Sequence, residues 1–285
     1  MAIGIGWPSA RTLRLFGVAK TLEHWVVARN PATDSENRIH ADEVARKYGF
    51  QGGLVPGVTI YAYACTPILE ALGEEWLAKG SATMRFSAPC YDGELLTATV
   101  ELPSAGESGQ PYAVAVSAGE RRCATGTAVT AGPPGPPDEI EWAPLPEERP
   151  TASPDVFAPA TVLGSIQLAT DQARTSSYLE GIDEPSPVYS RGRIVHPGML
   201  LNGANGVLVA NVVMPAWVHV ESRVQHWRPV EVGEPVQVRA IVADAFERKG
   251  HRFVAVDLAW VAGEGPGAQE LVASGRHTAI WRLAT

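Results

Sequence analysis

The stretch PGVTIYAYACTPILEAL, residues 56–72, decides how this chain folds. Its apolar residues cover a surface wider than the stripe of an ordinary amphipathic helix, which predicts a helix over 57–72 that is buried on most sides. A second stretch, PGMLLNGANGVLVANV at 197–212, opens with the same Pro-Gly pair and predicts a helix over about 198–212. Gly203 and Gly206 inside it lower helix propensity, which indicates backbone packed close to a neighbour.

The chain repeats itself after roughly 140 residues. Nineteen residues after the Gly of each Pro-Gly pair stands a tryptophan, Trp76 in one copy and Trp217 in the other. Further on, Pro89 and Gly93-Glu94 are answered by Pro229 and Gly233-Glu234. Solenoid repeats run to about 20–50 residues, so this period indicates one duplicated and fused domain.

Eight prolines crowd residues 131–154. Prolines at this density fix φ and remove backbone donors, so the segment is expected to be an extended linker. We therefore predict a first domain at 1–130, a proline-rich linker at 131–154 and a second domain at 155–285.

Each predicted helix is followed by segments rich in β-branched and aromatic residues. The predicted strands are 81–88, 94–102, 111–118 and 121–130 in the first copy, and 217–227, 234–243, 254–260 and 269–282 in the second. A helix that is apolar nearly all round needs cover on most sides, which a strongly curved sheet provides. The sequence thus predicts an α+β fold: two antiparallel sheets, each wrapped around a long central helix, the double hot-dog architecture.

Composition removes several classes of function. A formal net charge of −8 argues against nucleic acid as the main partner. No apolar run reaches the roughly 18–20 residues of a membrane span, and charged residues interrupt the N-terminal region where a signal peptide would be apolar. Three scattered cysteines are expected to be buried free thiols in a cytoplasmic protein. No metal-ligand spacing and no phosphate-binding loop is present, so we expect neither a metal nor a cofactor.

One segment carries residue types suited to proton transfer. It reads DSENRIHADEVA at 34–45 and is followed by FQGGLVPG at 50–57. This resembles the signature of the MaoC-like, or (R)-specific enoyl-CoA hydratase, family: Gly-Asp-x-Asn-Pro-Ile-His, then a short helix and a Gly-rich approach to the central helix. The positions that match in register are Asn37, Ile39, His40, Ala45 and Gly57.

The resemblance implies a lyase of fatty acid metabolism that reversibly hydrates a trans-2-enoyl thioester to the 3-hydroxyacyl thioester. Its substrate would be carried on coenzyme A or an acyl carrier. In that role His40 is a general acid and base, Asn37 orients its partner or the water, and the N–H of Gly57 binds the developing oxyanion. A glycine suits this last position because it allows close approach of the thioester.

The segment departs from the family pattern at two positions. The family's catalytic Asp lies five residues before the His, where this chain has Ser35, flanked by Asp34 and Glu36. Either flanking carboxylate could act if the loop shifts by one residue. The His of the family's His-Gly pair is Pro56 here. Two alternatives therefore stay open: a hot-dog acyl-CoA thioesterase, and a catalytically silent protein that binds acyl-CoA.

The second copy lacks the motif and is expected to shape the pocket. Tyr189 stands where the first copy has His40, and no Asn precedes it. His196, just before the second helix, is more often structural than catalytic in such a place. Arg191 and Arg193 lie either in a solvated loop or in a clamp for the phosphates of coenzyme A. Because the duplication supplies the pseudo-dimer within one chain, we expect a monomer or a homodimer.

Overall fold

The computed structural model describes residues 14–16, 19–103, 110–132, 135–268 and 270–284. Its strands form a single antiparallel sheet in the order β1-β2-β4-β5-β6-β3-β8-β11-β10-β9-β7. The first six strands belong to the first half of the chain and the other five to the second half. The halves meet where β3 pairs with β8, with Met84 opposite Ser222.

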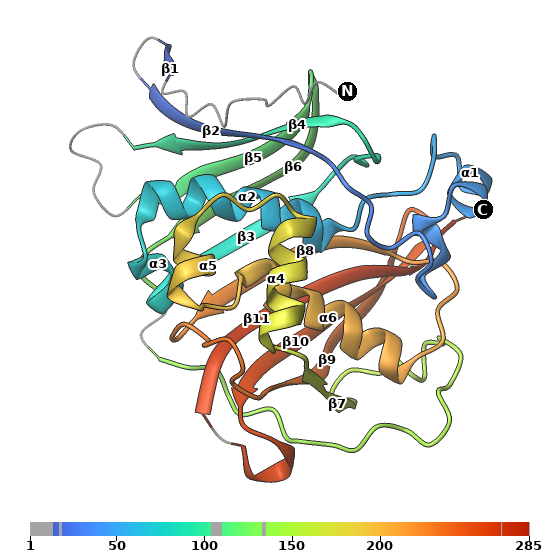
Figure 1. The fold of residues 1–285 in the computed structure, drawn as a ribbon. Coiled ribbons are helices and arrows are strands. Elements are labelled where there is room, and N and C mark those ends of the chain that lie inside the picture. Colours follow the sequence, from blue (N-terminus) through green and yellow to red (C-terminus); the bar gives the residue numbers. More distant parts are fainter. Residues whose placement is uncertain (1–13, 17–18, 104–109, 133–134, 269, 285) are drawn as a thin grey trace, which may run out of the picture.

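The strands of the first half are β1 (Arg14–Phe16), β2 (Ala19–Val27), β3 (Ser81–Phe86), β4 (Leu95–Leu102), β5 (Tyr112–Ala118) and β6 (Arg121–Val129). Those of the second half are β7 (Val162–Leu168), β8 (Val218–His226), β9 (Val236–Arg248), β10 (His251–Ala262) and β11 (Glu270–Arg282). Each of the two sets curves around one long helix (Figure 1).

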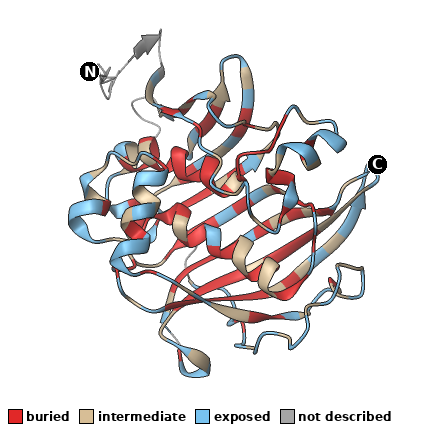
Figure 2. Cartoon of the chain, turned by 45° about the vertical axis from the view of Figure 1, so that its right-hand side comes forward, coloured by how far each residue is buried: buried red, intermediate tan, exposed pale blue. Residues whose placement is uncertain are grey.

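The two long helices are α2 (Gly57–Leu72) and α6 (Pro197–Asn211), which contact each other along the middle of the molecule. Their buried residues merge with the inner face of the sheet into one core that spans both halves (Figure 2). A Cβ at Gly203 would lie 2.8 Å from Val238, and one at Gly206 would lie 2.8 Å from Ile166. These contacts confirm the close packing expected of the two helix glycines.

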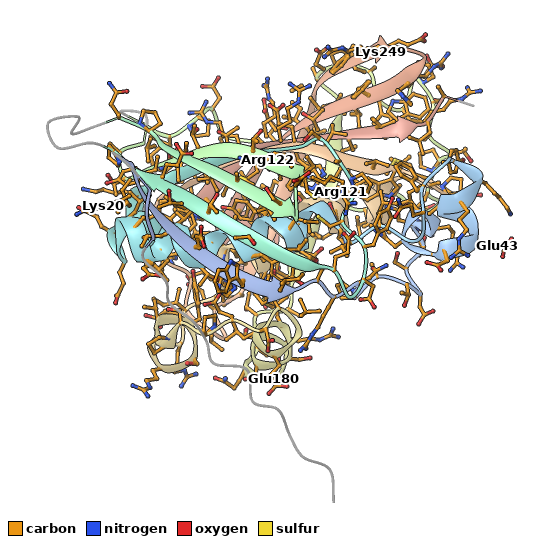
Figure 3. All side chains as sticks on the ribbon, turned by 90° about the horizontal axis from the view of Figure 1, so that it is seen from above. Lys20, Glu43, Arg121, Arg122, Glu180 and Lys249 are labelled. Atoms are coloured by element: carbon orange, nitrogen blue, oxygen red, sulfur yellow. The ribbon has the colours of Figure 1, made fainter. Side chains whose placement is uncertain are left out.

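Short helices complete the structure: α1 (Asp42–Lys47), α3 (Glu75–Lys79), α4 (Gln172–Gly181) and α5 (Pro187–Gly192). Helices α4 and α5 lie on the side of α2 and α6 that faces away from the sheet (Figures 1 and 3). They come from the second half and cover the region where the two long helices meet.

The double hot-dog fold predicted from the sequence is confirmed, with two differences. Strands β1, β2 and β7, which precede the two copies of the pre-helix segment, were not predicted. The two sheets are also joined edge to edge at β3 and β8. Between β6 and β7 the described residues form no helix and one isolated bridge, from Thr151 to Val213. The domain limits at 131–154 stay a prediction.

Candidate functional site

A cavity of about 260 Å³ lies where the pre-helix segment of the first half meets β8 of the second. Its lining is mostly apolar, with a few polar groups from both halves, as in typical small-molecule sites. The residues that line it are Asn37, Ile39, His40, Phe50, Leu54, Val55, Pro56, Gly57, Ile60, Phe86, Ser87, Ala88, Pro89, Cys90, Asn205, Trp217, Val218, His219, Val220 and Ile280.

Asn37 is fixed by the backbone of the other half. Its Oδ1 accepts the N–H of Trp217 at 3.0 Å, and its Nδ2 donates to the carbonyl of Trp217 at 3.0 Å. A flipped amide would lose both bonds, so this pair determines which end of the side chain is the donor. Asn37 also precedes the short helix Arg38–His40 and caps it. The amide N–H is thereby directed to His40.

His40 is held as a neutral imidazole. Its Nδ1 lies 2.6 Å from the carbonyl oxygen of Leu54, which can only accept, so Nδ1 carries the proton. The lone pair is therefore on Nε2, which accepts a longer bond of 3.2 Å from Asn37 Nδ2. Burial lowers the pKa of His40, and the bond to Leu54 only partly opposes it. At neutral pH the ring is an uncharged base.

Gly57 opens α2, and the first N–H groups of a helix have no acceptor within it. These groups and the helix dipole favour an oxygen with developing negative charge at this point. A Cβ at Gly57 would lie 2.6 Å from His219 Nδ1 and 3.3 Å from Phe86. The glycine therefore makes room for the His219 ring, a reason that the sequence did not suggest.

His219 connects this point to a chain of hydrogen bonds. Its Nε2 lies 2.7 Å from the Ser222 hydroxyl, which lies 3.0 Å from Nδ1 of His277. Burial, and next the neighbouring His277, lower the pKa of His219 well below its usual value; the Glu221 carbonyl opposes them. The ring is neutral, and its Nδ1 is buried without a partner among the described residues. The Ser222 hydroxyl can donate to His219 or to His277. In the first case His219 Nδ1 carries the ring proton and is a donor, and in the second case it is an acceptor.

The carboxylates expected beside His40 lie elsewhere. Asp34 is exposed, and Glu36 is exposed and pairs with Arg149 at 2.8 Å. Ser35 donates to the carbonyl of Asn37 and is not among the lining residues. Neither Asp34 nor Glu36 is among the lining residues. The one-residue shift that would bring Asp34 or Glu36 to His40 is therefore not present.

The corresponding segment of the second half is closed. Tyr189 is buried, and His196 caps α6 by accepting the N–H of Gly198 at 3.0 Å on its Nδ1. His196 thus has the structural contact expected of a histidine at a helix start. Arg191 and Arg193 are exposed, and neither lines the cavity. A phosphate clamp at these two residues stays a prediction.

Two polar residues that the second half contributes to the cavity were missed by sequence reasoning. They are His219 on β8 and Asn205 on α6, whose Oδ1 is buried and unpartnered among the described residues. Trp76 lies in the helix α3 and Trp217 directly precedes β8, so the two tryptophans are not equivalent in the structure and their matching spacing gave no signal for His219. For Asn205 the sequence also gave no signal, because tertiary packing determines which face of α6 borders the cavity.

Among the residues that the structure describes, no group of three or more His, Cys, Asp or Glu side chains could hold a metal ion. No helix in the described ranges has the length and apolar character needed to cross a membrane.

Comparison with known proteins places the chain by its fold. No family model and no curated protein sequence matches it. A structure described as a MaoC domain protein dehydratase from Chloroflexus aurantiacus aligns with 99% of this chain and 100% of its own, with a TM-score of 0.63 at 12% identity. A double hot-dog protein from Mycobacterium tuberculosis aligns over 86% and 88%, with a TM-score of 0.58 at 13% identity.

Proteins named as thioesterases are also among the structural neighbours. An oleoyl thioesterase structure from Lactobacillus plantarum aligns over 93% of this chain and 96% of its own, with a TM-score of 0.51 at 11% identity. The chain is therefore a double hot-dog protein, and its neighbours include MaoC-like dehydratases as well as thioesterases.

Proposed function

We propose that this protein adds water reversibly to a trans-2-enoyl thioester and gives the 3-hydroxyacyl thioester. The observation that carries the proposal is the state of His40: a buried neutral imidazole whose acceptor Nε2 is held among the cavity residues, with the start of α2 lining the same cavity. A base at His40 and an oxyanion-binding group at the start of α2 would then share one small, mostly apolar cavity. Such a chamber suits the acyl part of a thioester, with the carrier outside.

The proton transfers can be assigned to one residue. His40 Nε2 takes a proton from water as the water oxygen bonds to C3, and the C2=C3 electron pair moves towards the thioester oxygen. The N–H of Gly57, at the start of α2, stabilises that oxygen. The His40 imidazolium then returns the proton to C2 on the same face. Asn37 has to give up its 3.2 Å bond to Nε2 during this step, which the length of that bond makes inexpensive.

His219 is the second group that we assign to the thioester oxygen. An oxygen at the start of α2 needs donors, so it would select the tautomer with the proton on His219 Nδ1. The chain through Ser222 to His277 allows this tautomer without a net charge. A neutral donor is useful here because burial makes an imidazolium costly.

The test uses purified protein with crotonyl-CoA. Loss of the absorbance of the conjugated enoyl thioester measures hydration, and release of free thiol measures hydrolysis. We expect hydration, and we expect His40→Gln to reduce its rate by about 10²–10⁴-fold, the usual contribution of general acid–base catalysis. The matched control is Tyr189→Phe in the second copy, which removes a hydroxyl without a partner among the described residues. Full activity in His40→Gln would refute the assignment.

A catalytically silent acyl-thioester binder is the second candidate. It is favoured by the absence of any Asp or Glu from the cavity lining in the described residues. The same absence weighs against a thioesterase that activates water with a carboxylate. Binding of crotonyl-CoA with neither signal in the assay would select this candidate, and free thiol release would select the thioesterase.

A further inference from the structure

The cavity is open on one side and closed on the other. Lining residues that reach the surface mark the open side: Ser87 is exposed, and Phe50, Ala88 and Pro89 are partly exposed. Ile60, on the first turn of α2, lines the same cavity but is only 3% exposed. A thioester whose carrier stays outside therefore enters past Ser87 and directs its acyl chain towards Ile60.

The inner walls from the first half end close to the helix start. On α2 the lining stops at Ile60, and Ala64, one turn further on, is fully buried and does not line the cavity. On β3 it stops at Phe86, and Met84, the next residue on the same face, is fully buried outside the lining. The core thus closes the cavity after about one turn of α2, a rise of about 5 Å.

The wall formed by the second half also ends early. Val220 lines the cavity, but Ser222 is buried outside the lining, with its hydroxyl 2.7 Å from His219 Nε2. An acyl chain that went deeper would have to break this hydrogen bond or displace core side chains such as Met84. Both are costly, because protein interiors are close-packed and buried polar groups need their partners.

The volume of the cavity sets an upper limit on the acyl group. A water molecule takes about 30 Å³ in the liquid and a chain carbon occupies a similar space, so the 260 Å³ cavity holds about eight or nine non-hydrogen atoms. A 2-hexenoyl group with its carbonyl oxygen has seven such atoms, which leaves room for the attacking water. A 2-octenoyl group has nine and leaves none.

We propose that the cavity accepts acyl groups of up to about six carbons, and that Ile60 is the end wall that sets this limit. The proposal rests on the proposed function for the kind of ligand, an acyl thioester. It adds the class of substrate, short-chain acyl thioesters, and the residue that selects it.

The first test measures binding, so that it does not depend on turnover. Saturated butyryl-, hexanoyl-, octanoyl- and decanoyl-CoA are titrated into the folded full-length protein in a calorimeter. Two further buried methylenes should make hexanoyl-CoA bind about tenfold more tightly than butyryl-CoA. Overpacking should make decanoyl-CoA bind at least about tenfold more weakly than hexanoyl-CoA. Affinity that keeps rising through decanoyl-CoA, or no binding of any ester, overturns the proposal.

Hydration of the matching 2-enoyl esters separates this proposal from the proposed reaction. The kcat/KM should follow the same order, with 2-hexenoyl-CoA preferred and 2-decenoyl-CoA at least about tenfold poorer. Binding with this chain-length limit but without hydration of any ester would refute the proposed reaction and support the limit. Hydration that does not decline beyond six carbons would support the reaction and overturn the limit.

Two substitutions on α2 test the end wall. Ile60→Ala removes side-chain volume at the closed end, so it should bind octanoyl-CoA at least about tenfold more tightly than the wild type does. Ile68→Ala is the matched control, because Ile68 is fully buried two turns further on and does not line the cavity. It should lose a similar amount of stability and keep the wild-type preference.

A milder substitution keeps the test decisive. Ile60→Val removes a single carbon and should shift the preference in the same direction if circular dichroism shows that Ile60→Ala does not fold. Equal shifts at Ile60 and Ile68, or no shift in a folded Ile60 variant, would overturn the role of Ile60 as the end wall.

Discussion

The two pre-helix segments precede the two long helices in the same way, but their surroundings differ. In the first half, the start of α2 at Gly57 borders a cavity that His40 and His219 also line. In the second half, a Cβ at Gly198 would lie 2.5 Å from the hydroxyl of Tyr178, which α4 places there. The same helix start thus borders a cavity in one copy and is part of the core in the other.

The difference shows that the side chains around each helix start, more than its backbone, determine whether a cavity lies there. Glu184 stands five residues before Tyr189, which is the position of the carboxylate in the hydratase pattern. Its oxygens accept the Ser186 N–H at 2.8 Å and the Thr66 hydroxyl at 2.9 Å, and lie 3.4 Å from His196 Nε2. The second copy therefore has a buried carboxylate with a structural role. The first copy has His40, and no Asp or Glu is among the described residues that line its cavity.

The largest expected effect comes from removing that buried carboxylate. Glu184→Ala leaves the Thr66 hydroxyl and the Ser186 N–H without their acceptor and removes the carboxylate 3.4 Å from His196 Nε2, and we expect a loss of about 3 kcal/mol of stability. A carboxylate change in the first copy, Glu36→Ala, breaks an exposed pair and should cost less than about 1 kcal/mol. Urea unfolding at pH 7 measures both. Equal losses would contradict the contrast between the copies.

The same residue gives a pH dependence with a definite sign. Burial raises the pKa of Glu184, but the bonds from His196, Ser186 and Thr66 outweigh it, and the net pKa is below the ordinary 4.5. Its contribution to stability is therefore complete above pH 4.5 and is lost as the pH falls through the lower folded-state value. Glu184→Gln should unfold with a weaker acid dependence than the wild type. A parallel pH profile would count against this account.

The two glycines test the comparison at matched positions. Gly57→Ala must displace His219, and Gly198→Ala must displace Tyr178 and approach Ala62, so each should lose about 1–3 kcal/mol. Only Gly57→Ala should also lower turnover of crotonyl-CoA, because only this helix start borders the cavity. A loss of turnover in Gly198→Ala at full folding would show that the second segment takes part in the reaction.

Asn37→Asp restores an acid beside His40. An anionic oxygen in place of the amide N–H favours the imidazolium, so the pKa of His40 should rise by about one unit. Asn37→Ala only removes the opposing donor and should give a smaller rise. Titration of the His40 ring protons by NMR distinguishes the two. A fall in pKa with Asn37→Asp would mean that the carboxylate turns away from the ring.

The smallest effects are expected at Arg191 and Arg193. Both are exposed, so alanine at either should change the free energy of unfolding by less than about 0.5 kcal/mol. We also expect the KM for crotonyl-CoA to stay within about twofold. A tenfold rise, about what loss of a charged phosphate contact gives, would establish the phosphate clamp.

Much of the fold could be predicted from local patterns. The helix predicted over 57–72 coincides with α2, because nearly every position is apolar and its start has a clear Pro-Gly signal. Strands β1, β2 and β7 were missed. In β2, partly buried and exposed residues replace the clean alternation that marks a strand, since its neighbours and α2 cover it unevenly.

The candidate site could be predicted only in the half that carries the motif. Asn37, His40 and Gly57 lie within 21 residues of one another in the sequence and in one cavity in the structure. Their partners, His219 and the backbone of Trp217, are about 160 to 180 residues away along the chain. A local sequence pattern cannot show that residues so far apart in the chain are in contact, because only the pairing of β3 with β8 brings them together.

The sequence by itself determined the duplication, the two buried helices and the divergence between the pre-helix segments. These features follow from side-chain chemistry and short-range spacing. Tertiary structure alone decided that Asp34 and Glu36 face outward, that His219 lies against Gly57, and that Tyr178 fills the space at Gly198. Each of these depends on which side chain another element brings to the start of α2 or α6, and so on packing between residues distant in the chain.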